Sequence, residues 1–138
     1  MNQLDNMLAK WQPVALSLFR FMTGLLLLQY GIAKIFKFPA VPFFAKVELM
    51  SLIGVAGMLE LVLGALLMIG LCTRIVAFVL SGEMAFAYFL GHMFKDAAKP
   101  VFLPLLNGGT AAILFCFACL YLATAGGGPI SVDAMRKK

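Results

Sequence analysis

The sequence predicts an all-α membrane protein: an antiparallel bundle of four transmembrane helices preceded by a short interfacial N-terminal helix. Of the 138 residues, 63% are hydrophobic and only 12% are charged, whereas a soluble domain is about half apolar and a quarter charged. The mean hydropathy is +1.00. The apolar runs reach the length of about 18 residues that suggests a membrane span. They are continuous rather than alternating, which argues against a β-barrel.

Residues 1–12 form a short amphipathic stretch. Leu4, Met7, Leu8 and Trp11 fall on one helical face, and the polar residues lie elsewhere. This pattern is typical of a helix that lies in the membrane interface.

Turn-forming residues separate the four expected spans. Pro13 suits the first position of a helix, and Pro39 and Pro42 mark an apolar connector after the first span. The Cys72–Thr73 turn is so tight that the third span must lie antiparallel beside the second, and residues 126–129 end the fourth. We expect spans at about 14–36, 48–71, 74–94 and 100–125, in a single domain over residues 1–138.

The basic residues flank the apolar runs, where they meet lipid headgroups. The net charge of +5 therefore indicates the lipid bilayer as a partner and not nucleic acid. The first apolar run carries Arg20 and Lys34 and has no small-x-small cleavage site, so no cleavable signal peptide is expected. An even number of spans places both termini on one side, which we expect to be the cytoplasmic side of a bacterial inner membrane.

Two of the six acidic residues, Glu60 and Glu83, lie near the middle of apolar runs. A carboxylate at that depth costs roughly 2.5–3.5 kcal/mol on insertion scales, so it should face the protein interior. From the terminal-side edge, Arg20 lies roughly 9 Å deep, Glu83 roughly 13 Å and Glu60 roughly 16 Å. These adjoining layers predict an Arg20–Glu60 ion pair.

Helical phase places these charges beside glycines, which let helices approach closely. One stripe of the first span consists of Arg20, Gly24, Leu27, Gly31 and Lys34. One face of the second span consists of Gly57, Glu60 and Gly64. The ion pair has two open interpretations: a tie that specifies packing, or part of a site for binding or proton movement. Glu83 is either a neutral, inert acid or a proton carrier.

Polar side chains also gather toward the opposite side of the membrane. They are Gln29, Tyr30, Lys34, Tyr88, His92, Asn107 and Thr110. Two interpretations remain open: a pocket mouth for an amphipathic ligand with an oxygen-bearing head, or anchoring at the interface with hydrogen bonds between helices. Polar residues on opposite faces of the third span leave a homo-oligomer open.

Cys116 and Cys119 form a C-x-x-C pair inside the last span. Redox pairs of this spacing work at helix N-termini, so small packing residues and a redox or soft-metal role both remain open. No metal site is predicted from the sequence. It has no phosphate-binding glycine loop, no H-E-x-x-H and no nucleophile elbow.

Several short motifs recur in a fixed order along almost the whole chain. They are Arg20-x-x-x-Gly24, Tyr30-Gly31-Ile32-Ala33-Lys34-Ile35, Glu60-x-x-x-Gly64, Gly70-Leu71-Cys72-Thr73-Arg74-Ile75-Val76-Ala77, Met84, His92, Asn107-Gly108-Gly109, Leu120-Tyr121-Leu122 and Gly128-Pro129-Ile130-Ser131-Val132-Asp133. Together they resemble the DoxX family of small bacterial membrane proteins.

The resemblance implies a four-helix membrane bundle with its termini inward. The family name comes from a subunit of an archaeal terminal quinol oxidase and thiosulfate:quinone oxidoreductase, and some relatives are associated with redox stress and thiol homeostasis. The resemblance carries over Arg20, Glu60, Arg74 and His92 as site candidates. Relatives often have Glu after the Asn-Gly-Gly segment, where this chain has Thr110.

The leading hypothesis is an accessory or small subunit of membrane redox chemistry that binds a quinone-like ligand beside redox-enzyme partner subunits. Whether the chain itself catalyses a reaction stays open. The alternatives are a non-enzymatic carrier of small amphipathic molecules and a structural scaffold for a membrane complex. The expected ligand-binding residues are Arg20, Glu60, Glu83, Tyr88, His92 and Asn107.

Overall fold

The computed structural model describes residues 2–138, and within that range it is helical with no strand. The all-α prediction is therefore confirmed. The elements in chain order are α1 (Gln3–Lys10), α2 (Gln12–Phe36), η1 (Pro42–Phe44), α3 (Leu52–Ile69), α4 (Thr73–Tyr88), η2 (Phe89–Met93), α5 (Pro104–Asn107), α6 (Thr110–Ala125) and α7 (Val132–Arg136).

Three helical segments are long and apolar enough to cross a bilayer: Gln3–Phe36, Leu52–Ile69 and Thr73–Met93. The first joins α1 to α2 and the third joins α4 to the π-helical turn η2. The second begins later than the predicted 48–71, because Ser51 caps α3 by accepting a hydrogen bond from the Gly54 amide at 3.1 Å.

The predicted fourth span, 100–125, is not one continuous helix. After the single turn of α5, Gly108 adopts a left-handed φ of 73°, which favours glycine. The Asn107 side chain then accepts a hydrogen bond from the Gly109 amide at 2.8 Å. The remaining helix α6 has 16 residues, or about 24 Å at 1.5 Å per residue, which is shorter than the hydrocarbon core of about 30 Å.

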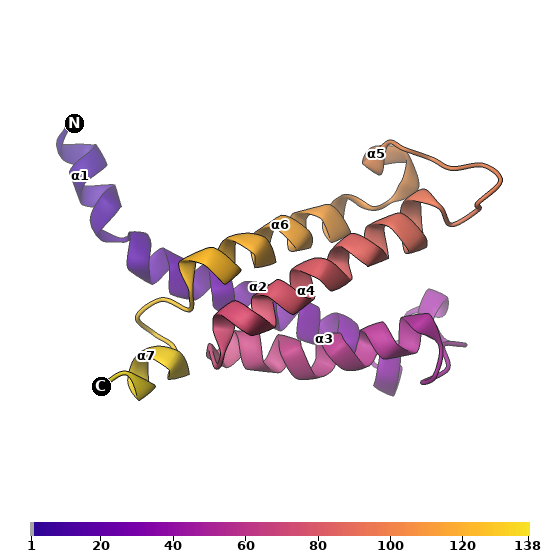
Figure 1. Cartoon of the computed structure of the whole chain (residues 1–138), viewed down its shortest axis with the longest axis horizontal. Coiled ribbons are helices and arrows are strands. Elements are labelled where there is room, and N and C mark those ends of the chain that lie inside the picture. The colour runs from indigo at the N-terminus through magenta and orange to yellow at the C-terminus, as the bar shows by residue number, and fades with distance from the viewer. Residues whose placement is uncertain (1) are drawn as a thin grey trace.

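The long helices pack in two pairs, α2 with α3 and α4 with α6, and the pairs meet mainly through α3 and α4 (Figure 1). The turn between α3 and α4 passes through Gly70 and Cys72, both at positive φ. Both chain ends lie at the same end of the molecule, where Figure 1 shows α1 and α7, and α5 lies at the other end.

The outer surface of the helices is strongly apolar. Ile75, Phe78, Leu114 and Phe117 are each more than 60% exposed. A soluble monomer rarely exposes apolar patches of this extent, whereas a bilayer covers them. The chain is a membrane protein whose helices contact lipid.

Glycines bring the backbones of α2 and α3 into direct contact. A Cβ added at Gly24 would lie 2.4 Å from the Met68 amide nitrogen, and one at Gly31 would lie 2.4 Å from that of Leu61. On the facing helix, a Cβ at Gly64 would lie 2.8 Å from the Leu28 nitrogen. Such approach is the usual use of small residues at helix interfaces in membranes.

We predict that Gly24→Ala destabilises the fold by about 1–3 kcal/mol, because the added methyl group must push α2 and α3 apart. Gly82→Ala is the matched control: its Cβ would meet nothing within 4 Å. It should be neutral or stabilising by up to about 1 kcal/mol through helix propensity. Reversible unfolding in mixed detergent micelles, followed by circular dichroism, measures both. Equal effects of the two changes would contradict the proposed backbone contact.

Candidate functional site

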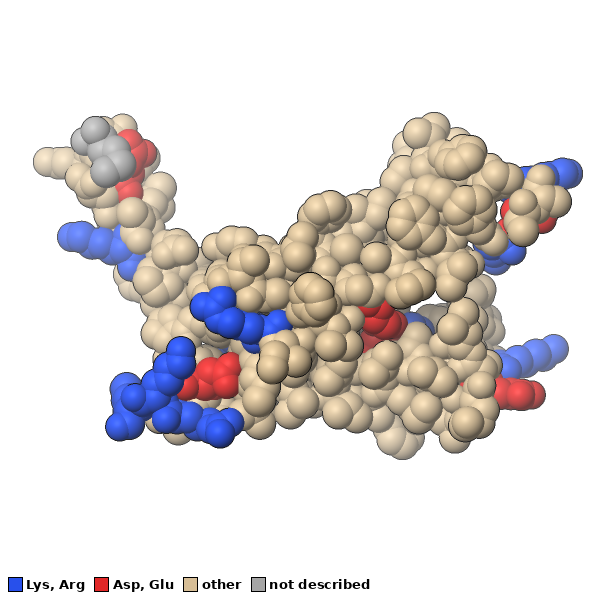
Figure 2. Space-filling model, viewed as in Figure 1, with Lys and Arg blue, Asp and Glu red and all other residues tan. Residues whose placement is uncertain are grey.

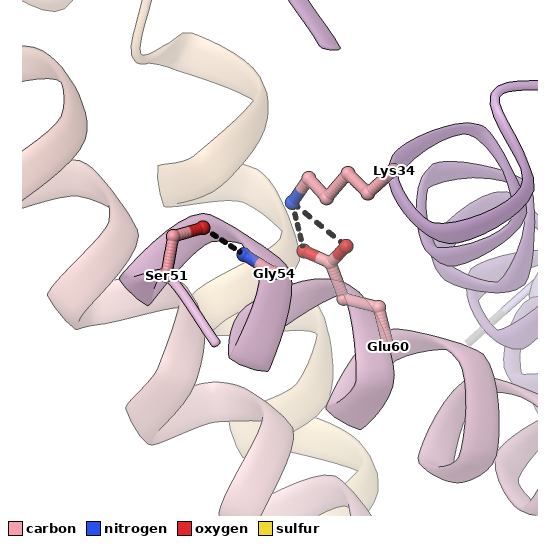
Figure 3. A network of polar contacts seen from close by, with 4 residues as sticks. All are labelled: Lys34, Ser51, Gly54 and Glu60. Atoms are coloured by element: carbon pink, nitrogen blue, oxygen red, sulfur yellow. Dashed lines mark hydrogen bonds and ion pairs between the residues drawn. The ribbon is translucent and has the colours of Figure 1, made fainter. Parts of the chain in front are cut away.

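An ion pair joins the last turn of α2 to the middle of α3. The Lys34 ammonium group donates hydrogen bonds to both carboxylate oxygens of Glu60, each at 2.8 Å (Figure 3). The side chains are 12% and 3% exposed, so both charges are largely withdrawn from solvent. The stem of Lys34 lies against Gly57, where an added Cβ would come within 2.8 Å of the Lys34 Cβ. The absence of a side chain at Gly57 therefore makes room for the lysine.

A third charged group, Glu83 of α4, lies within electrostatic range of this pair. Both of its carboxyl oxygens are buried and accept no hydrogen bond from residues 2–138, and the Glu60 carboxylate lies beside them. A buried polar group without a partner is costly. Glu83 therefore either shares a proton with Glu60 or binds something else.

Aromatic rings lie beside the ammonium group of Lys34. The nitrogen is 5.9 Å from the centre of the Tyr30 ring and 5.6 Å from that of Phe44. Tyr30 also packs edge-on against Phe115 of α6. Figure 2 shows acidic atoms and a hollow between the two helix pairs, on the half of the molecule toward α5. The cluster thus combines charge with aromatic surface and lies where the helix pairs separate.

The predicted Arg20–Glu60 ion pair is wrong. Arg20 is 3% exposed, but its hydrogen bonds all go to backbone carbonyls: Gly127 at 2.9 Å, Leu67 at 2.8 Å, Ile130 at 2.6 Å, and Met68. Leu67 and Met68 lie in the last turn of α3, whose carbonyls lack helical partners. Arg20 therefore caps α3 and ties the C-terminal loop to α2, and these contacts use four of its five N–H donors.

Tyr88, His92 and Asn107 do come together, as the sequence suggested. The Tyr88 hydroxyl donates to the Phe102 carbonyl at 3.0 Å, and the Asn107 amide group lies 3.3 Å from that hydroxyl. Asn107 also donates to the Val101 carbonyl, and His92 Nδ1 lies 3.2 Å from the Asn107 carbonyl oxygen. These contacts fasten the loop before α6 to the end of α4, which favours the interpretation of hydrogen bonds between helices.

The remaining candidates lie elsewhere. Arg74 lies at the terminal end and donates to the carbonyls of Ala123 and Thr124 at the end of α6. Cys119 is fully buried, and Ser81 donates to the Cys116 carbonyl at 2.8 Å. Within residues 2–138, no group of three or more His, Cys, Asp or Glu side chains is arranged to hold a metal ion.

Sequence reasoning missed that Lys34 is the partner of Glu60. Lys34 lies at the far end of the stripe predicted on the first span. At that depth it groups with the polar side chains expected at a pocket mouth rather than with Glu60. The signal in the sequence is the position of Lys34 one turn beyond Gly31. Because Gly31 lets the α3 backbone approach closely, α3 lies directly beside that turn. A lysine stem of four carbons can then extend back along α3 to reach Glu60.

These observations define a helical membrane protein with a charged cluster at the contact of its helices. A family model described as DoxX matches residues 15–93, a range that includes Lys34, Glu60 and Glu83. A protein of Haemophilus influenzae, itself described only as uncharacterized, is 36% identical over 140 residues, covering 93% of this chain and 95% of the relative. The chain belongs to the DoxX family. No solved structure matches it.

We predict that Lys34→Met destabilises the fold by about 3–5 kcal/mol, because it leaves the buried Glu60 carboxylate without its partner. The double variant Lys34→Met/Glu60→Leu should recover most of that loss, since it removes both charges. Lys46→Met, at an exposed lysine, is the control and should change little. Unfolding in mixed micelles gives the coupling free energy, and a coupling near zero would show that the pair does not hold α2 to α3.

Proposed function

We propose that this chain is a single-domain protein of the bacterial inner membrane that crosses the bilayer four times, with both termini in the cytoplasm. Three helices have the length and hydropathy of spans. The shorter α6 packs along the whole of its partner α4 (Figure 1). A short helix can cross when the bilayer thins locally or flanking residues extend to the interface.

We further propose that the cluster of Lys34, Glu60 and Glu83 binds a quinone-like ligand, and that the protein serves as an accessory subunit of a membrane redox enzyme. The observation that carries this proposal is the buried Glu83 carboxyl group, whose oxygens accept no hydrogen bond from the rest of residues 2–138. Ionisable groups inside membrane bundles are rare and usually mark a ligand or proton path.

A quinone-like head suits the chemistry around Glu83. Its ring oxygens can accept hydrogen bonds from the Lys34 ammonium group or from a protonated carboxyl group. Its flat ring can pack against Tyr30 and Phe44, whose rings already flank Lys34. An apolar tail can lie between the helix pairs, among the hydrophobic side chains that cover the bundle. Proton exchange with Glu83 would complement electron transfer by a partner subunit.

This proposal changes the roles that the sequence suggested. Arg20, Tyr88 and Asn107 direct their donors to backbone or to one another, so they act as supports of the fold rather than as ligand contacts. Lys34 takes the place that the sequence gave to Arg20. Glu83 becomes the residue that meets the ligand head.

We predict that Glu83→Leu weakens binding of a short-chain ubiquinone analogue about 10- to 100-fold, because it removes the protonated carboxyl donor and leaves a quinone oxygen buried without a hydrogen bond. Glu48→Leu, at an exposed acid outside the helices, is the matched control and should bind as the wild type does. Binding is followed as the rise in melting temperature on titration, and co-purifying molecules are identified by mass spectrometry.

The same measurements separate the alternatives. Wild-type protein that carries no quinone, and that is not stabilised by the analogue, would contradict the proposal. Uptake of an amphipathic solute into liposomes by the purified protein alone would then favour a carrier. A protein that neither binds nor transports, and whose Glu83→Leu variant still assembles with its partners, would be a scaffold.

A further inference from the structure

At the terminal end of the molecule, α4, the glycine-rich loop and α7 line an open pocket of about 610 Å³. Its lining includes the basic side chains of Arg74, Arg136 and Lys137 and the acidic side chain of Asp133. Figure 2 shows basic side chains gathered at this end, beside acidic atoms. The lining therefore carries excess positive charge. None of these residues belongs to the cluster around Glu83.

Asp133 already occupies the N-terminus of α4. Its carboxylate oxygens accept hydrogen bonds from the amides of Cys72 and Thr73, both at 2.8 Å. Burial by itself raises the pKa of the Asp133 carboxyl group, but these amides and the charge of Arg136 outweigh it and hold the pKa below its usual value. Asp133 is therefore ionised at neutral pH and fixes α7 against α4, which leaves the three basic side chains to face the pocket.

One basic side chain in the pocket lining retains unused hydrogen-bond donors. Arg74 uses only Nη1 in its hydrogen bonds to α6, and its Nε and Nη2 donate to nothing within the described chain. The Thr73 hydroxyl is not such a free donor, because it interacts with the Asp133 carboxylate and helps to lower the pKa of Asp133. Such donors around a basic pocket suit an anion with several acceptor oxygens, as a phosphate group has.

The surroundings of the pocket indicate which kind of molecule would supply such a phosphate group. The pocket lies where α4 begins and α6 ends. With both helices spanning the bilayer as proposed above, this end falls at the level of the lipid headgroups. Ile75 lines the pocket and is 72% exposed, and Phe78, one turn further along α4, is 66% exposed. An acyl chain can lie along this apolar face while its headgroup enters the pocket.

We propose that this pocket binds the headgroup of an anionic phospholipid, with Arg74, Arg136 and Lys137 around the phosphate and an acyl chain along Ile75 and Phe78. Lipid bound here would bridge α4, α6 and α7. It would also hold the terminal end of the protein in a leaflet rich in anionic lipid, since each basic residue near such a surface adds attraction.

Native mass spectrometry of the delipidated protein in neutral detergent tests the proposal, with phosphatidylglycerol and phosphatidylcholine of the same acyl chains as probes. Phosphatidylglycerol should bind at least about tenfold more tightly than phosphatidylcholine. Arg136→Gln/Lys137→Gln should lose most of that preference, since each charge contributes about fivefold. The control Lys46→Gln/Lys99→Gln, with the same charge change at exposed lysines outside this pocket, should keep it.

A second variant should strengthen the binding of phosphatidylglycerol instead of weakening it. Asp133→Asn keeps an oxygen for the α4 amides and removes the negative charge, so phosphatidylglycerol should bind more tightly to it. Glu83→Leu should leave lipid binding unchanged, which separates this site from the proposed quinone site.

Three results would overturn the proposal. The first is equal binding of the two lipids, and the second is an equal loss of the lipid preference in Arg136→Gln/Lys137→Gln and in Lys46→Gln/Lys99→Gln. The third is binding of glycerol phosphate as tight as that of the lipid. The second would indicate diffuse surface charge, and the third a soluble phosphate ligand.

Discussion

The direct backbone contact between α2 and α3 is the constraint on which the rest of the structure depends. Where Gly24 and Gly31 meet α3, no side chain fits between the helices. Long side chains on the same stripe must therefore extend along the neighbouring helix instead of across the interface. Lys34 does so toward Glu60, and Arg20 does so toward the carbonyls that end α3. One close contact thus positions both the Lys34–Glu60 ion pair and the cap that closes the terminal end.

Local patterns in the sequence were sufficient to predict much of this arrangement. The spacing of Arg20, Gly24, Gly31 and Lys34 predicts one buried stripe, and Gly57, Glu60 and Gly64 predict the face that meets it. All of these residues are buried or half-buried in the structure. The grouping of Tyr88 with Asn107 could also be predicted, because both lie toward the same end of consecutive helices. In each case helical period and depth suffice, and both follow from the sequence.

The identity of the ion pair could not be predicted in the same way. Depth along the helix places Arg20 near Glu60, but it says nothing of what else competes for a guanidinium group. The competitors are the carbonyls of Gly127 and Ile130, which reach Arg20 only because the chain folds back after α6. Such a partner depends on contacts between residues more than a hundred positions apart. The break at Gly108 is similarly hidden, since an Asn-Gly-Gly segment permits a turn without requiring one.

The division into two helix pairs explains why the Glu83 carboxyl oxygens can remain without a hydrogen-bond donor. Within each pair the helices contact one another along their length, whereas the pairs meet mainly through α3 and α4. Glu83 projects from one pair toward charges that belong to the other, so its environment depends on how closely the pairs approach. A ligand that enters the hollow between them (Figure 2) would meet Glu83 without having to separate Lys34 from Glu60. The ion pair would keep α2 and α3 together while the acid opposite it exchanges its proton or its partner.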